Sequence, residues 1–144
     1  MIGDGVLVHA TCVAIGGRGV LLTGPSGAGK SDLALRLIDR GAMLVSDDQT
    51  RVSPRGDRLI ASAPATIAGR LEVRGVGIVT LPAAPPPPLA LCVALDGTPE
   101  RLPDEPLPMR EVAGRLLPLI ALAPFEASTP LKIEQALVCY GLSA

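Results

Sequence analysis

The chain has very few aromatic residues. Among its 144 residues there is no tryptophan, and Phe125 and Tyr140 are the only phenylalanine and tyrosine. Aliphatic side chains must therefore fill the core, and a nucleobase pocket would have few rings on which a base could stack. We accordingly expect any recognition of a base to be weak.

Cysteine is also scarce. Cys12, Cys92 and Cys139 are odd in number, widely spaced and without a C-x-x-C pair, which argues against a disulfide framework and against a zinc site. A reducing, cytoplasmic location fits this usage best. The N-terminus lacks a basic segment followed by a long apolar run, and the apolar stretch LLPLIALAPF is short and interrupted by prolines. We therefore expect neither a signal peptide nor a membrane span.

Neither sign of charge dominates. The 13 basic and 14 acidic residues give a formal net charge of −1, which provides no electrostatic surface for nucleic acid or for an anionic membrane. The expected partner is a small molecule or a protein. The length is that of one domain, 1–144, and a hydrophobic content of 48% supports a packed core.

Apolar segments alternate with turn signals along the chain. Two strands joined by a glycine-rich turn at 16–19 are predicted within VLVHATCVAIGGRGVLLTG, followed by a helix over SDLALRLIDRG. The later predictions are a strand AMLVS, a hairpin in RVSPRGDRLIAS, a turn with strands in PATIAGRLEVRGVGIVTL, strands LALCVALD and LLPLIAL, and a helix near 130–142. Residues 85–88 are consecutive prolines and predict a connector, and TPERLPDEPLPMRE is predicted to be a long surface loop.

A phosphate-binding motif lies between the second strand and the first helix. GPSGAGKS matches G-x-x-x-x-G-K-[ST], and its glycines allow backbone N–H groups to point at phosphate oxygens. Lys30 is the candidate that reaches the β and γ phosphates of ATP, and the Ser31 hydroxyl is a candidate ligand of Mg²⁺. The nucleotide-binding candidates are Gly24, Pro25, Ser26, Gly27, Ala28, Gly29, Lys30 and Ser31.

Two adjacent carboxylates follow the next predicted strand, in MLVSDDQ. Helix residues 31–40 carry the chain about 15 Å away from the phosphates, and residues 42–46 return about 16 Å as a strand. Asp47 and Asp48 should therefore lie level with the phosphate-binding loop. Because neighbouring strand residues point to opposite faces, at most one of them should face the transferring phosphoryl group, and the two should have different roles.

With HATCVAI, GPSGAGKS, LVSDD and LEVRGVGIV in this order, the stretch from His9 to about Leu81 resembles the catalytic domain of the HPr kinase/phosphorylase family. The resemblance implies an α/β fold, namely a single P-loop-containing domain with a mixed, strand-rich sheet, similar to phosphoenolpyruvate carboxykinases. It implies a kinase that uses Mg²⁺ and ATP to phosphorylate a serine of the phosphocarrier protein HPr. Such proteins also remove this phosphate with inorganic phosphate, which gives pyrophosphate, and they form homo-hexamers.

The resemblance also implies roles for individual residues. Asp48 looks like the catalytic carboxylate that takes the serine proton, and Asp47 would help to order magnesium. Glu72 matches a magnesium-binding glutamate. His9 matches a catalytic histidine, with a structural histidine at a strand end as the alternative. Arg101 aligns with an arginine that stabilises the transferred phosphoryl group, with a merely solvated arginine as the alternative.

The chain departs from longer members of this family in two places. They carry an additional N-terminal domain, so the chain resembles a short form. They also carry a basic catalytic loop that PMREVAGRLLP matches poorly, so Arg110 and Arg115 are only candidates and the phosphorylase activity stays open. Two other functions remain as alternatives: a small-metabolite kinase, and a non-catalytic module that senses ATP and docks a partner. A GTPase is disfavoured because no N-K-x-D motif is present.

Overall fold

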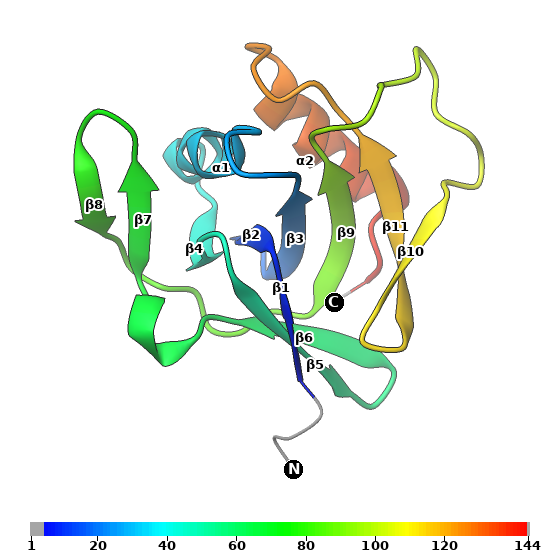
Figure 1. Cartoon of the computed structure of the whole chain (residues 1–144). Helices are drawn as coiled ribbons and strands as arrows, with labels where there is room; N and C mark the ends of the chain where they lie inside the picture. Colours follow the sequence, from blue (N-terminus) through cyan, green and yellow to red (C-terminus); the bar gives the residue numbers. More distant parts are fainter. Residues whose placement is uncertain (1–4, 144) are drawn as a thin grey trace.

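The computed structural model describes residues 5–143, with a six-stranded mixed sheet at its centre (Figure 1). Its strands are β2 (Ala10–Ile15), β3 (Arg18–Thr23), β4 (Met43–Ser46), β9 (Leu89–Ala94), β10 (Met109–Val112) and β11 (Arg115–Ala121). They lie in the order β10-β11-β9-β3-β2-β4. The pairs β3–β9 and β9–β11 are parallel, whereas β2 is antiparallel to both β3 and β4, and β10 is antiparallel to β11. The predicted α/β class with a mixed, strand-rich sheet is confirmed.

Two helices cover one face of this sheet, α1 (Lys30–Asp39) and α2 (Thr129–Tyr140) (Figure 1). The apolar side chains of each strand alternate between the faces, as the two-residue period of a strand requires. In β3, for example, Val20 and Leu22 belong to the core cluster beneath the helices, and Leu21 belongs to the cluster on the other face. Neither helix is long and apolar enough to cross a membrane, nor is any other among the residues described.

A second, three-stranded sheet covers the opposite face. It has the order β1-β5-β6. Val52 and Leu59 of this sheet pack in one apolar cluster with Leu21 and Cys92 of the larger sheet. A separate hairpin of two strands packs beside α1, where Leu71 is fully buried. The elements of these parts are β1 (Val6–Val8), β5 (Thr50–Arg55), β6 (Arg58–Ser62), a 3₁₀ turn η1 (Ala65–Ile67), β7 (Arg70–Val73) and β8 (Gly77–Thr80).

The cysteines are free thiols in two different settings. Cys12 and Cys92 are buried, and Cys139 is exposed. Burial raises the pKa of the Cys12 and Cys92 thiols, so both remain neutral and pack as small apolar groups.

Most of the predicted elements are present, and two predictions are wrong in part. The two predicted hairpins and the helix after the glycine-rich loop are confirmed, although the turns are confined to 16–17 and 56–57 because the strands extend further into them. The predicted surface loop is shorter than expected, because β10 begins directly after its last proline and buries Val112. The first apolar segment is not one strand: it bends at His9, where the chain passes from the three-stranded sheet to the six-stranded sheet.

The carboxyl ends of β3 and β4 lie at the same edge of the sheet. Because β2 is antiparallel to both strands, β3 and β4 run in the same direction. The glycine-rich loop, residues 24–29, leaves β3 at this edge, and Asp47 and Asp48 follow β4 there. The predicted return of the two aspartates to the level of the loop is therefore confirmed.

An ion pair joins the two helices. Arg40, directly after α1, donates from its guanidinium to the carboxylate of Glu134 in α2 at 2.9 and 2.8 Å. The hydrogen bond from Arg40 lowers the pKa of Glu134.

Replacing Glu134 by Gln should slightly lower the free energy of unfolding at neutral pH, because partly exposed ion pairs contribute little. Since the folded-state pKa of Glu134 is lowered, its contribution is present above the ordinary value of 4.5 and is lost as pH falls through the folded-state value. Urea unfolding at pH 7 and pH 3 measures this, with Glu111→Gln at an exposed position of β10 as the control. An equal difference between wild type and Glu134→Gln at both pH values would contradict the prediction.

Candidate functional site

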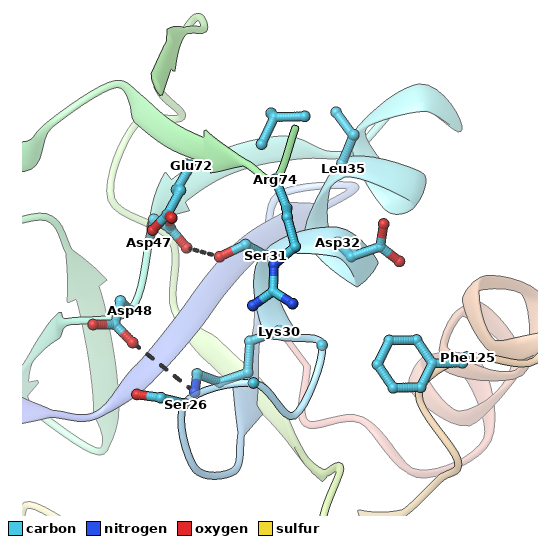
Figure 2. A pocket seen from close by; sticks show the side chains of 13 residues that line it. Ser26, Lys30, Ser31, Asp32, Leu35, Asp47, Asp48, Glu72, Arg74 and Phe125 are labelled. Atoms are coloured by element: carbon cyan, nitrogen blue, oxygen red, sulfur yellow. Dashed lines mark hydrogen bonds and ion pairs between the residues drawn. The ribbon is translucent and has the colours of Figure 1, made fainter. Parts of the chain in front are cut away.

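A pocket of about 560 Å³ opens at the edge of the sheet where β3 and β4 end. It is bounded by the glycine-rich loop, the start of α1, the segment after β4, the end of β7 and the segment before α2 (Figure 2). The lining residues are Ser26, Gly27, Gly29, Lys30, Ser31, Asp32, Leu35, Asp47, Asp48, Glu72, Val73, Arg74 and Phe125. Five segments that are distant in the sequence therefore meet around one cavity.

Three glycines shape the loop between β3 and α1. Gly24, Gly27 and Gly29 have φ values of 149°, 87° and 95°, in a region that residues with a side chain rarely adopt. At Gly29 the ring of Phe125 is also close, since a Cβ atom would lie 2.8 Å from two of its carbon atoms. Helix α1 begins directly after Gly29, and the first N–H groups of a helix have no partners within it. The loop and helix start can therefore bind an anion.

Lys30 is buried and folds back along this loop. Its Nζ donates to the carbonyl oxygens of Gly24 at 2.7 Å and Pro25 at 3.1 Å. The same Pro25 carbonyl accepts the N–H of Ala28 at 3.0 Å, which closes the turn of the loop. Lys30 Nζ also lies 3.9 Å from Asp48 Oδ1, so the ammonium group links the loop with the segment after β4.

The carboxylate of Asp47 accepts three hydrogen bonds. The hydroxyls of Ser31 and Thr11 donate to Oδ1 at 2.6 and 3.1 Å, and the backbone N–H of Glu72 donates to Oδ2 at 3.0 Å. These bonds come from α1, β2 and β7. One carboxylate therefore holds three elements in position around the pocket.

Asp48 directs its carboxylate elsewhere. Its φ is +67°, a left-handed conformation that Asp and Asn adopt more readily than other residues with side chains. Its backbone N–H donates to Thr11 Oγ1 at 3.0 Å, and its Oδ1 lies 2.8 Å from Nε2 of His9. The side chain is 54% exposed, so this carboxylate is accessible to a ligand.

The two aspartates are separated for a different reason from the one predicted. Strand β4 ends at Ser46, so the alternation of strand residues does not apply to the pair. Both carboxylates line the pocket. The left-handed backbone of Asp48 turns its carboxylate towards His9 and Lys30, whereas Asp47 contacts Ser31. Strand alternation is therefore the wrong reason for their separation, whereas the expectation that at most one of them faces the transferring phosphoryl group stays a prediction.

The structure brings together His9, Lys30, Ser31, Asp47 and Asp48, and Glu72 lines the same pocket.

The arginines proposed from the sequence lie elsewhere. Arg101 lines a separate groove beside α2. Arg110 and Arg115 belong to the β10–β11 hairpin, where Arg110 lies 3.8 Å from the sulfur of Cys92 and Arg115 donates to the carbonyl of Gly56. Within residues 5–143, none of the three lines the pocket at the glycine-rich loop.

Three residues of the site were not predicted from the sequence. Thr11 is fully buried and its hydroxyl touches both aspartates. Thr11 lies two residues after His9, but the chain bends at His9, so strand alternation could not have predicted that both side chains contact Asp48. Arg74 extends across the pocket from the end of β7 (Figure 2). Phe125 lines the pocket from a segment without any motif, so no sequence pattern could have found it.

The oxygen atoms on one side of the pocket are suitable ligands for a magnesium ion. Ser31 Oγ and Asp47 Oδ1 are 2.6 Å apart, and Glu72 lines the same wall. Mg²⁺ is usually held by one or two protein oxygens together with phosphate oxygens and waters. A group of three or more His, Cys, Asp or Glu side chains that could hold a metal is not found among the described residues.

Comparisons with known proteins identify relatives of half of the chain. HPr kinase/phosphorylases from Clostridium tetani, Mycoplasmopsis pulmonis and an Exiguobacterium species are 47%, 42% and 48% identical over 75, 76 and 73 residues. These alignments cover 52%, 53% and 50% of the chain and 25%, 25% and 24% of the relatives. The chain thus spans about a quarter of the length of the curated relatives it matches.

A solved structure extends the similarity over nearly the whole chain. The structure of the Hpr(Ser) kinase/phosphatase from Coxiella burnetii is 30% identical, has a TM-score of 0.79, and is matched over 93% of this chain and 95% of that one. The family model described as the HPr Serine kinase C-terminal domain matches residues 2–84, which include the glycine-rich loop and both aspartates. The chain therefore belongs to the HPr serine kinase C-terminal domain family.

Proposed function

We propose that this chain is a Mg²⁺- and ATP-dependent kinase that phosphorylates a serine of HPr, and that it also removes this phosphate with inorganic phosphate. The observation that carries the proposal is the accessible Asp48 carboxylate, which lies 2.8 Å from His9 and 3.9 Å from Lys30 beside a glycine-rich loop. Membership of the family and the names of the relatives supply the protein substrate.

In the kinase direction, the loop N–H groups and Lys30 hold the β and γ phosphates of ATP. Asp48 accepts the proton of the serine hydroxyl while the serine oxygen attacks the γ phosphorus. The bond from this phosphorus to the bridging oxygen breaks, and ADP leaves. His9 orients the Asp48 carboxylate, because its Nε2 contacts the same oxygen that Lys30 approaches.

In the reverse direction, an oxygen of inorganic phosphate attacks the phosphorus of phosphoserine. The bond to the serine oxygen breaks, Asp48 returns a proton to that oxygen, and the new phosphorus–oxygen bond gives pyrophosphate. A loop that binds the β and γ phosphates of ATP can also bind this product, since both carry two linked phosphoryl groups.

Ser31 and Asp47 would hold magnesium, and the side chain of Glu72 would add a further oxygen. The ion, when bound, neutralises phosphate charge. Asp47 orients Ser31 and Glu72, because it accepts hydrogen bonds from the Ser31 hydroxyl and from the Glu72 backbone N–H.

The remaining parts of the proposal have two different grounds. The chain length supports a single domain over 1–144, and the cysteine usage supports a cytoplasmic location. The family resemblance supports a phosphoenolpyruvate-carboxykinase-like P-loop architecture and assembly as a homo-hexamer. The assignment of Arg101 to the transferred phosphoryl group stays a prediction, and its position beside α2 would require the 95–108 segment to move, or a second copy of the chain to supply the residue.

Replacing Asp48 by Asn should lower phosphoryl transfer from Mg-ATP to HPr by about a hundredfold or more, because Asn cannot accept the serine proton. Asn tolerates the left-handed backbone at this position, so the fold should persist. The measurement is the initial rate of phosphoserine formation on HPr. Asp57→Asn, in the exposed β5–β6 turn, is the matched control and should behave as wild type. A wild-type rate for Asp48→Asn would exclude Asp48 as the base.

Phosphoserine-HPr incubated with the protein, Mg²⁺ and inorganic phosphate should yield pyrophosphate and HPr in equal amounts. The two products can be followed by phosphorus NMR and by a gel that separates phosphorylated from free HPr. Release of inorganic phosphate without pyrophosphate would mean that water is the acceptor, and the proposed reverse reaction would then be wrong.

Replacing Thr11 by Val should disturb the aspartate pair. The variant keeps the shape but leaves the Asp48 N–H without its acceptor, a loss of about 1–3 kcal/mol in the free energy of unfolding. We also expect faster hydrogen exchange of the Asp48 amide and slower phosphoryl transfer. Thr50→Val is the matched control, because Thr50 is equally buried and its hydroxyl donates to the carbonyl of Ala10 at 2.8 Å without touching either aspartate. Equal effects of the two variants on Asp48 exchange and on transfer would argue against the role of Thr11.

A further inference from the structure

One of the residues that line the pocket is an exposed phenylalanine. Phe125 is 68% exposed, although the chain contains only one other aromatic residue and has an aliphatic core. Its ring lies directly against the glycine-rich loop, because a Cβ atom at Gly29 would come within 2.8 Å of two ring carbons. Single exposed apolar side chains are common on protein surfaces. Phe125 differs from the others in its place, because its ring lines the pocket and lies against the glycine-rich loop.

The segment that carries Phe125 is fastened to helix α1 on both sides of the ring. The guanidinium of Arg36 donates from Nη2 to the carbonyl of Pro124 and from Nη1 to the carbonyl of Glu126, the latter at 3.1 Å. Its Nε donates to the carboxylate of Asp32 one turn earlier, also at 3.1 Å. Arg36 thereby contacts the carbonyl groups of the two residues that flank Phe125, and Asp32 orients the guanidinium. The backbone that carries the exposed ring is consequently held beside α1.

The ring and the catalytic carboxylate lie at opposite ends of the pocket. In Figure 2, Asp48 is on one side of Lys30 and the glycine-rich loop, and Phe125 is on the other side. A nucleoside triphosphate whose terminal phosphate lies at Asp48 and Lys30 extends across the loop, so its base must leave on the side away from Asp48. This side carries Phe125 and, from the first turns of α1, Leu35.

We propose that Phe125 is the surface on which the base of the bound nucleotide stacks, and that Arg36 is the residue that positions it. The inference rests on the proposed use of ATP and names the residues that bind its base. Stacking on an aromatic ring tolerates different bases, because each base has a π face. Phe125 therefore supplies affinity for the base with little selectivity, and ATP and GTP depend on it alike.

The test compares a ligand that has a base with one that has none. Mg-ATP and Mg-tripolyphosphate carry the same chain of three phosphates, and titration calorimetry gives a dissociation constant for each. Phe125→Ala should weaken Mg-ATP binding about tenfold, which lies in the range for loss of one base–aromatic stack, and should leave tripolyphosphate binding unchanged. Phe125→Tyr keeps the ring and should bind both ligands as wild type does. Because Phe125 is mostly exposed, the Ala variant should fold, which its circular dichroism spectrum verifies.

Arg40, four residues after Arg36, provides a matched control for Arg36. Arg36→Met removes the contacts to Pro124 and Glu126, whereas Arg40→Met removes an ion pair of α1 with α2. If Arg36 positions the ring, Arg36→Met weakens Mg-ATP about threefold without affecting tripolyphosphate, and Arg40→Met affects neither ligand. Similar losses for both ligands in Arg36→Met would show a general disturbance of the loop and would overturn its positioning role.

The remaining outcomes separate this inference from the proposed function. Equal weakening of Mg-ATP and tripolyphosphate in Phe125→Ala would overturn the stacking role, since the loss would then concern the phosphates. Unchanged binding of both ligands would overturn it as well, including the case in which only the KM for HPr rises and the ring serves the protein substrate. Failure of the wild-type protein to bind either ligand would refute the use of ATP, and with it both proposals.

Discussion

The arrangement of the site depends on the three hydrogen bonds to the Asp47 carboxylate. They come from Ser31 at the start of α1, from Thr11 in β2 and from the backbone of Glu72 in β7. Hydrogen bonds to an ionised acceptor are stronger than those between neutral groups. If the Ser31 hydroxyl turns to bind a cation, the bonds from Thr11 and Glu72 still hold Asp47 in place. The carboxylate can therefore take part in binding without losing its position.

Asp48, next to Asp47, has a left-handed backbone conformation that residues with a side chain rarely adopt. A residue with a side chain in a sparsely populated backbone region is retained only where the surroundings hold it. Here the holding group is again Thr11, whose hydroxyl accepts the Asp48 N–H while it donates to Asp47. One buried hydroxyl thus connects the carboxylate that organises the site with the one that is open to a ligand. This coupling explains how two like charges are adjacent in sequence and yet have separate partners.

Local patterns predicted the parts of this site that follow from regular geometry. The lengths of the helix and strand between Ser31 and Asp47 predicted that the aspartates lie at the loop. The 2.6 Å hydrogen bond from Ser31 to Asp47 agrees with this prediction. Strand alternation failed for the pair, because the chain leaves β4 before Asp47 and takes a left-handed turn at Asp48. Phe125 could not be predicted either, since its place depends on the path of a loop about 95 residues after Gly29 and on carbonyl groups that Arg36 contacts. Backbone contacts of this kind leave no trace in residue type.

Helix α1 connects the two ends of the pocket. At its start, Lys30 lies close to Asp48 and Ser31 donates a hydrogen bond to Asp47. About two turns later, Arg36 holds the segment that carries Phe125. Within a helix these positions are rigidly related, because successive residues rise by about 1.5 Å. The distance between the Lys30 end and the Phe125 end is therefore set by α1 together with the contacts of Arg36 to the segment of Phe125. A ligand that spans both ends meets a site whose length is determined before it binds, which reduces the ordering that binding requires.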